Sequence, residues 1–145
     1  MRRYPDARSQ LPVRELYIRH SKTLIGVGAS GGDEKKLGYA YEWVALTNPY
    51  TLSKNQKVQL QLWKGDRPVA HQSVSVFTRG NGDNGQRVLP VRHRTDSKGT
   101  LSLQVSPGDS VLVNTVCFTP TPERDTVQAL AWQSDWVSMS FSVPS

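Results

Sequence analysis

Hydrophobic and polar residues alternate with a period of two along most of this chain. In residues 101–105 and 137–143 every second side chain is apolar, and the residues between them are serine or glutamine. Residues 58–62 follow the same rule, and Val74 and Val76 repeat it between serines. Successive side chains of a strand point to opposite faces, so these runs predict strands with one face in a core and the other in water.

Turn residues separate the alternating runs. The segments 95–99 (TDSKG) and 106–109 (SPGD) are typical of tight turns, and 80–85 (GNGDNG) of a looser one. Further strands are expected near residues 15–20, 23–27, 39–46 and 89–94, whereas only residues 122–132 could hold a helical turn. The pattern predicts an all-β fold, an immunoglobulin-like or transthyretin-like β-sandwich of about 7–8 antiparallel strands.

The length of 145 residues fits one domain. Residues 1–12, with two prolines and several charges, are expected to be a flexible lead-in, and residues 13–145 a single β-sandwich domain. No apolar run approaches the roughly 20 residues of a membrane-spanning helix, so we expect no membrane insertion of this segment.

The net charge of +6 is scattered rather than clustered. Such a distribution is typical of an ordinary solvated surface, and we expect no nucleic-acid partner. The polar side of the strands offers three candidate binding residues. Arg92 and Arg94 alternate with His93 and should point outward, and Trp63 lies on the polar side of its strand. Exposed aromatic and arginine side chains can stack on ligands, although tryptophan packs in cores more often.

The three histidines, His20, His71 and His93, are the candidate metal ligands. They lie more than twenty residues apart, so a metal site would have to be assembled across strands, with Asp66 or Asp96 completing it. We expect at most weak, pH-dependent binding of a divalent ion and no other cofactor.

One short motif could indicate catalysis. Gly28-Ala-Ser30-Gly-Gly32 fits the G-x-S-x-G pattern of a nucleophile elbow. That elbow requires a strand–turn–helix unit above a parallel sheet, and the sequence shows no alternation of strands and helices. A loop is the better interpretation, and no catalytic residue is expected. Cys117, the only cysteine, is expected to be a buried thiol.

Five segments in this order resemble a bacterial family of exported proteins of unknown function: residues 21–28, 37–50, 62–69, 95–99 and 136–144. Members are often labelled as periplasmic components of cobalt or nickel uptake systems. The resemblance covers roughly residues 20–145. Family members carry a signal peptide and an early histidine-bearing segment that are absent here, so this chain is expected to be the C-terminal domain. Residues 64–69 and 95–99 also resemble transthyretin-like and carboxypeptidase-regulatory-like sandwiches, in which such residues shape turns.

The resemblance implies a periplasmic, non-catalytic binding or accessory domain linked to uptake of divalent nickel or cobalt. Its partner would be a membrane transporter or another exported protein. The alternative is a structural or adhesive protein–protein interaction module. Histidines and carboxylates gathered at one rim would favour the first function, and a flat apolar face the second.

Overall fold

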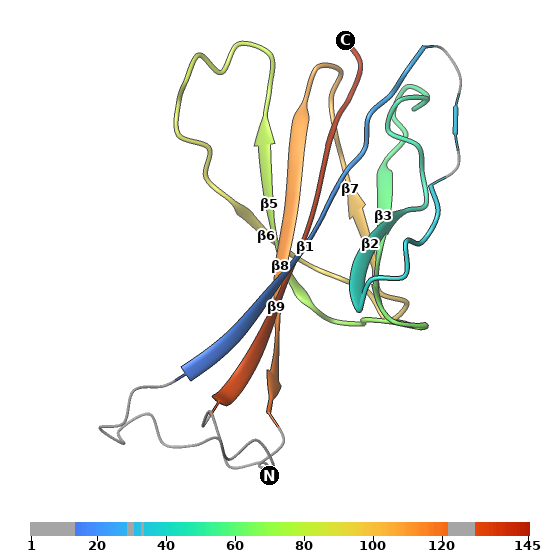
Figure 1. The fold of residues 1–145 in the computed structure, drawn as a ribbon. Helices are drawn as coiled ribbons and strands as arrows, with labels where there is room; N and C mark the ends of the chain where they lie inside the picture. The colour runs from blue at the N-terminus through green and yellow to red at the C-terminus, as the bar shows by residue number, and fades with distance from the viewer. Residues whose placement is uncertain (1–13, 29–30, 33, 122–129) are drawn as a thin grey trace.

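A computed structural model describes residues 14–28, 31–32, 34–121 and 130–145 (Figure 1). These residues form nine strands: β1 (Arg14–Thr23), β2 (Tyr41–Ala45), β3 (Val58–Lys64), β4 (Arg67–Pro68), β5 (Ser73–Arg79), β6 (Val91–Arg94), β7 (Thr100–Leu103), β8 (Ser110–Pro120) and β9 (Leu130–Ser142). The expected lead-in, residues 1–12, lies outside the described residues, as does most of the expected helical turn, whose last three residues belong to β9. The described part of the chain contains no helix long and apolar enough to cross a bilayer.

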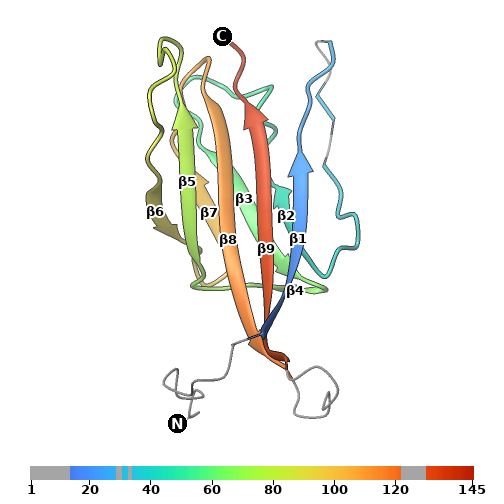
Figure 2. The same cartoon turned by 60° about the vertical axis from the view of Figure 1, so that its left-hand side comes forward.

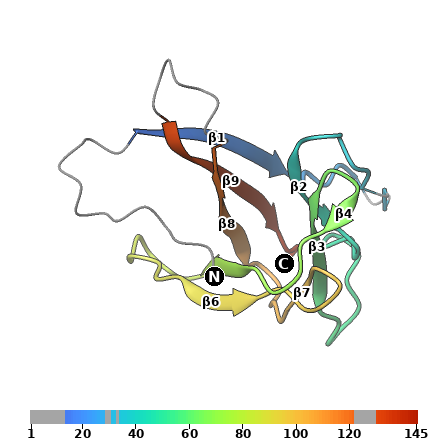
Figure 3. The ribbon, with the colours of Figure 1, turned by 90° about the horizontal axis from the view of Figure 1, so that it is seen from below.

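The strands form two sheets that face each other, which confirms the predicted all-β sandwich (Figures 1 and 2). One sheet has five strands in the order β1-β9-β8-β5-β6. In the other, β3 pairs with β2 on one edge and with β4 and β7 on the other. Seen from below, the two sheets lie on opposite sides of the core (Figure 3).

The core consists of the apolar residues that alternate along the strands, as expected. Buried members include Leu60 and Leu62 from β3, Val113 from β8 and Met139 from β9. Trp43 of β2 has no exposed surface, and its indole N–H donates to the Val137 carbonyl of β9 at 3.2 Å. A single side chain therefore fills the space between the sheets and also hydrogen-bonds across it.

One strand pair departs from the expected antiparallel pattern. β1 lies parallel to β9, in a register that sets Arg19 opposite Trp136 and Ser21 opposite Ser138. The two strands are separated by almost the whole chain, so no short hairpin forces them to run in opposite directions. β1 is also one continuous strand, where two strands near residues 15–20 and 23–27 were expected.

The side chains of β6 alternate between the two faces of the sheet as expected, but those on the inward side are less buried than expected. Arg92 and Arg94 point outward and His93 lies opposite Val74, yet Val91 is 60% exposed and Leu89 lies outside the strand. β6 is an edge strand, so only one neighbour shields its side chains.

The turn at residues 95–99 has the structural role that its resemblance implied. Asp96 Oδ1 accepts hydrogen bonds from the backbone N–H groups of Lys98 and Thr100, both at 2.8 Å. Gly99 has a φ of 73°, and a Cβ there would lie 3.0 Å from Pro68 Cβ. Glycine is therefore required at this turn both for its backbone conformation and for its close approach to β4.

Candidate functional site

The structure places the three candidate metal-binding histidines at separate positions. His20 lies on β1, at one edge of the five-stranded sheet, and His93 on β6, at the opposite edge. His71 is exposed and precedes β5, in a left-handed conformation with φ of 56°. Among the residues that the structure describes, no three His, Cys, Asp or Glu side chains gather as metal ligands would.

His20 has a carboxylate partner that the sequence reasoning missed. Its Nε2 lies 2.9 Å from Oδ1 of Asp135, which is only 1% exposed and also accepts a hydrogen bond from Gln133. The ring centroids of Tyr39 and Tyr41 each lie 6.2 Å from the centroid of the His20 imidazole. Asp135 has the same parity as Val137, Met139 and Phe141, so the alternation in β9 did contain the signal for an inward-facing acid.

His71 lies close to a second carboxylate. The pKa of Asp96 is lowered chiefly by the hydrogen bond from Thr100 N–H, with further contributions from Lys98 and from the charge of His71. One carboxyl oxygen is therefore already held by two backbone donors. Asp66, the other expected carboxylate, is exposed in the turn between β3 and β4.

The structure separates the three candidate binding residues into two groups. Trp63 is half-buried on β3, where the Lys36 ammonium lies 4.2 Å from the ring centroid, so its exposed face already has a cationic partner. Arg92 and Arg94 are exposed on β6, and Arg94 donates to the His71 carbonyl at 3.2 Å. Only the two arginines share a surface.

A buried ion cluster fastens the segment between β1 and β2 to the sandwich. The Lys22 ammonium lies 2.6 Å from Glu34 and 2.9 Å from Glu42, and donates to the Trp43 carbonyl at 2.8 Å. Burial disfavours the charge on Glu42, but hydrogen bonds from Leu37 N–H, Lys22 and Gly38 N–H outweigh it and hold the pKa of Glu42 below its ordinary value. This cluster is structural, because both carboxylates contact the same buried ammonium inside the fold.

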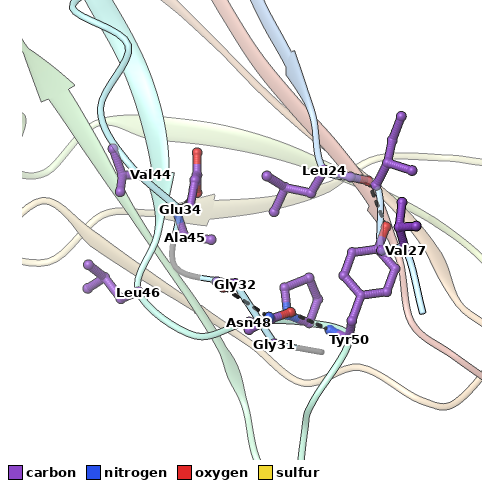
Figure 4. Close-up of a pocket in the computed structure, with 13 residues that line it drawn as sticks. Leu24, Val27, Gly31, Gly32, Glu34, Val44, Ala45, Leu46, Asn48 and Tyr50 are labelled. Atoms are coloured by element: carbon purple, nitrogen blue, oxygen red, sulfur yellow. Dashed lines mark hydrogen bonds between the residues drawn. The ribbon is translucent and has the colours of Figure 1, made fainter. Parts of the chain in front are cut away.

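A groove of about 620 Å³ lies beside this cluster, between the segments that follow β1 and β2 (Figure 4). Tyr50 OH donates to the Leu24 carbonyl at 2.6 Å, and the Asn48 amide donates to the Gly32 carbonyl at 3.2 Å. A Cβ at Gly26 would lie 2.5 Å from the Tyr50 ring, so the two segments approach closely. The hydrogen bonds of Tyr50 and Asn48 therefore join the two segments that form this groove.

The face of the five-stranded sheet that points away from the core, here called the outer face, has a different composition. Four of its rows follow from the strand pairing: Arg19–Trp136–Val116, Ser21–Ser138–Asn114–Ser75–Arg92, Thr23–Ser140–Leu112–Phe77 and Ser142–Ser110–Arg79. Tyr17 and Phe118 lie at one end of this face and are 61% and 64% exposed. Serines, aromatic residues and arginines therefore share one exposed surface.

Arg19 contacts two aromatic rings at one end of the outer face. The Arg19 guanidinium lies 5.8 Å from the Tyr17 ring centroid and 5.7 Å from that of Trp136. Trp136 is 39% exposed, and its indole N–H donates to Ser134 at 3.2 Å. These cation–π contacts hold a planar cation and two rings together at the surface.

Cys117 and Ser30 are the two other residues whose side chains could act as nucleophiles. Cys117 is buried, and burial, together with the nearby Asp135 charge, raises the pKa of its thiol to about 11. The thiol is therefore protonated at neutral pH and chemically unreactive. Ser30, the serine of the elbow-like motif, lies outside the described residues.

The fold and the site define an all-β sandwich domain with one exposed polar and aromatic sheet face. Residues 3–116 match the family described as Domain of unknown function (DUF4198), and the chain belongs to this family. The match agrees with the resemblance to a family of unknown function, although it begins earlier in the chain and ends within β8. No curated protein and no solved structure matches the chain.

Proposed function

We propose that this chain is a non-catalytic, exported binding domain that acts through the outer face. The observation that carries the proposal is the exposure of Tyr17, Phe118 and Trp136 on one sheet face, beside Arg19. Tyrosine, tryptophan and arginine dominate the energetics of binding surfaces, and a cluster of exposed aromatic side chains marks an interaction site.

The proposed cellular setting is the periplasm, in support of nickel or cobalt uptake. The resemblance supports this setting, and it names a membrane transporter or another exported protein as the partner. The turn contacts of Asp96 and Gly99 support an immunoglobulin-like or transthyretin-like sandwich. In this proposal the domain assists uptake by holding a partner, since its three histidines lie apart.

The isolated domain is expected to bind Ni²⁺ and Zn²⁺ only weakly. A lone His–carboxylate pair such as His20 and Asp135 offers too few ligands for tight binding, and its imidazole must lose any proton before it can coordinate. Calorimetric titration at pH 7.5 and pH 5.5 should show weak binding that fades in acid. A submicromolar, stoichiometric site lost in His71→Ala or His93→Ala would contradict the expectation.

A structural or adhesive protein–protein interaction module is the second candidate. β1 is an edge strand, and Leu16 and Ile18 on its other face are also exposed. An edge strand with exposed apolar side chains can pair with a strand of another protein.

Binding to the cell envelope tests the proposed function. The labelled protein should bind saturably to envelopes of the producing bacterium, and Trp136→Ala should weaken this binding at least tenfold. Leu46→Ala is the matched control, because Leu46 is exposed but lies away from the outer face. No saturable binding, or equal binding by Trp136→Ala and the wild type, would overturn the proposal.

A further inference from the structure

The outer face is wide, and small polar side chains fill its centre. Its middle row crosses all five strands, from Ser21 on β1 through Ser138, Asn114 and Ser75 to Arg92 on β6. With strands about 4.8 Å apart, the row spans about 19 Å. An extended polymer can lie along such a surface without inserting into a cleft.

The charge on this face has one dominant sign. Arg19, Arg79, Arg92 and Arg94 all lie on it. Among the residues that the structure describes, Glu15 also lies on this face, and it accepts a hydrogen bond from Ser134. Guanidinium groups bind carboxylates in bidentate geometry, so the face is complementary to a ligand that carries carboxylates.

The serine and threonine hydroxyls of the outer face indicate that the ligand carries hydroxyl groups as well as carboxylates. Ser21 lies 2.8 Å from Ser138, Thr23 lies 2.9 Å from Ser140, and Ser110 lies 3.3 Å from Ser142, each distance joining two hydroxyl oxygens. A hydroxyl both donates and accepts and can make more than one hydrogen bond. Sugar hydroxyls have the same double character, so a sugar can both donate to and accept from these side chains.

A shallow hollow on this face combines the same chemical groups. It measures about 400 Å³, and Phe77, Leu112, Arg79, Thr23 and Ser140 are among its lining residues. The apolar side chains can contact the C–H face of a sugar ring, while the hydroxyls and the guanidinium reach its polar edge. The volume lies within the range of small-ligand sites.

We infer that the outer face binds an acidic polysaccharide, a sugar polymer with carboxylate groups. This inference rests on one part of the proposed function, the placement of binding on the outer face, and it names a polysaccharide in place of a protein as the ligand bound there. The arginines bind the carboxylates, the serines and Asn114 bind sugar hydroxyls, and the aromatic side chains stack on sugar rings.

The test compares immobilised polymers that differ in one property each. The full chain should bind polygalacturonate and bind its neutral methyl ester at least tenfold more weakly, because the ester has lost the charge that arginine recognises. Poly-L-glutamate and double-stranded DNA, at equal charge concentration, should also bind more weakly. Equal or tighter binding of the ester, of polyglutamate or of DNA would overturn the inference.

Variants locate the site and separate the two proposals. Arg92→Gln and Arg19→Gln should each weaken polygalacturonate binding about tenfold, whereas Arg67→Gln, on β4 of the other sheet, should not change it. An equal loss in Arg67→Gln would overturn the inference. Envelope binding that needs Trp136 but is abolished by protease and unaffected by polygalacturonate would refute the polysaccharide and leave the proposed function standing.

Discussion

Replacing Lys22 with methionine should lower the free energy of unfolding by about 3–5 kcal/mol. The Lys22 ammonium is the counter-ion of both Glu34 and Glu42, and Glu42 is only 1% exposed. Methionine fills similar space but leaves two carboxylates near each other without a positive charge. Urea denaturation monitored by tryptophan fluorescence measures the loss.

An exposed lysine provides the control. Lys57→Met, at a solvent-exposed position before β3, should change the stability by less than about 0.5 kcal/mol. The double variant Lys22→Met/Glu42→Gln should lose less stability than the sum of the two single variants, because the removed charges interact. A loss below about 1 kcal/mol for Lys22→Met would show that the cluster does not hold this segment.

The same cluster sets a pH dependence. The pKa of Glu42 in the folded protein lies below its ordinary value of 4.5, so its ionised form favours folding. This contribution is complete above pH 4.5 and is lost as the pH falls through the lower, folded-state pKa. The stability gap between the wild type and Glu42→Gln should therefore narrow in acid.

Removing the Trp43 side chain should cost a similar amount, about 3–5 kcal/mol for Trp43→Ala. The side chain has no exposed surface, and its hydrogen bond to the Val137 carbonyl joins β2 to β9. Alanine would leave a cavity between the sheets and would remove the indole hydrogen bond to the Val137 carbonyl. Thermal and urea unfolding both measure this change.

The chain contains a matched tryptophan for comparison. Trp136→Ala, on the outer face, should lower the stability by a smaller amount, about 1–2 kcal/mol, because the side chain is 39% exposed and leaves no closed cavity. Equal losses in Trp43→Ala and Trp136→Ala would contradict the assignment of one to the core and the other to the binding face. The small cost also keeps Trp136→Ala folded for the binding experiments.

The alternation of residues was sufficient to predict the sandwich, because it reports which side of each strand is buried. It correctly predicted the inward side chains of β3, β7 and β9. It could not predict that β1 pairs with β9, since nothing local in either strand specifies a partner so far away in the chain. Long-range pairing depends on the packing of the whole domain.

The same limit explains which parts of the outer face were predicted. The outward positions of Arg92 and Arg94 followed from parity within a single strand. The contact between Arg19 and Trp136 required the β1–β9 register, and so sequence patterns alone could not reveal it. Asp135 differs, because its parity with Val137 already indicated a buried acid that needed a partner.

Amide NMR of the isotope-labelled protein, titrated with a galacturonate oligomer, tests the central claim most directly. Binding on the outer face should shift the amide signals of Arg19, Asn114, Ser138 and Arg92. It should leave unchanged those of Gln59 and Ser102, which lie on the outward side of the other sheet. Shifts that centre on Gln59 and Ser102 or on the groove beside Tyr50, or an absence of shifts at saturating ligand, would contradict the account.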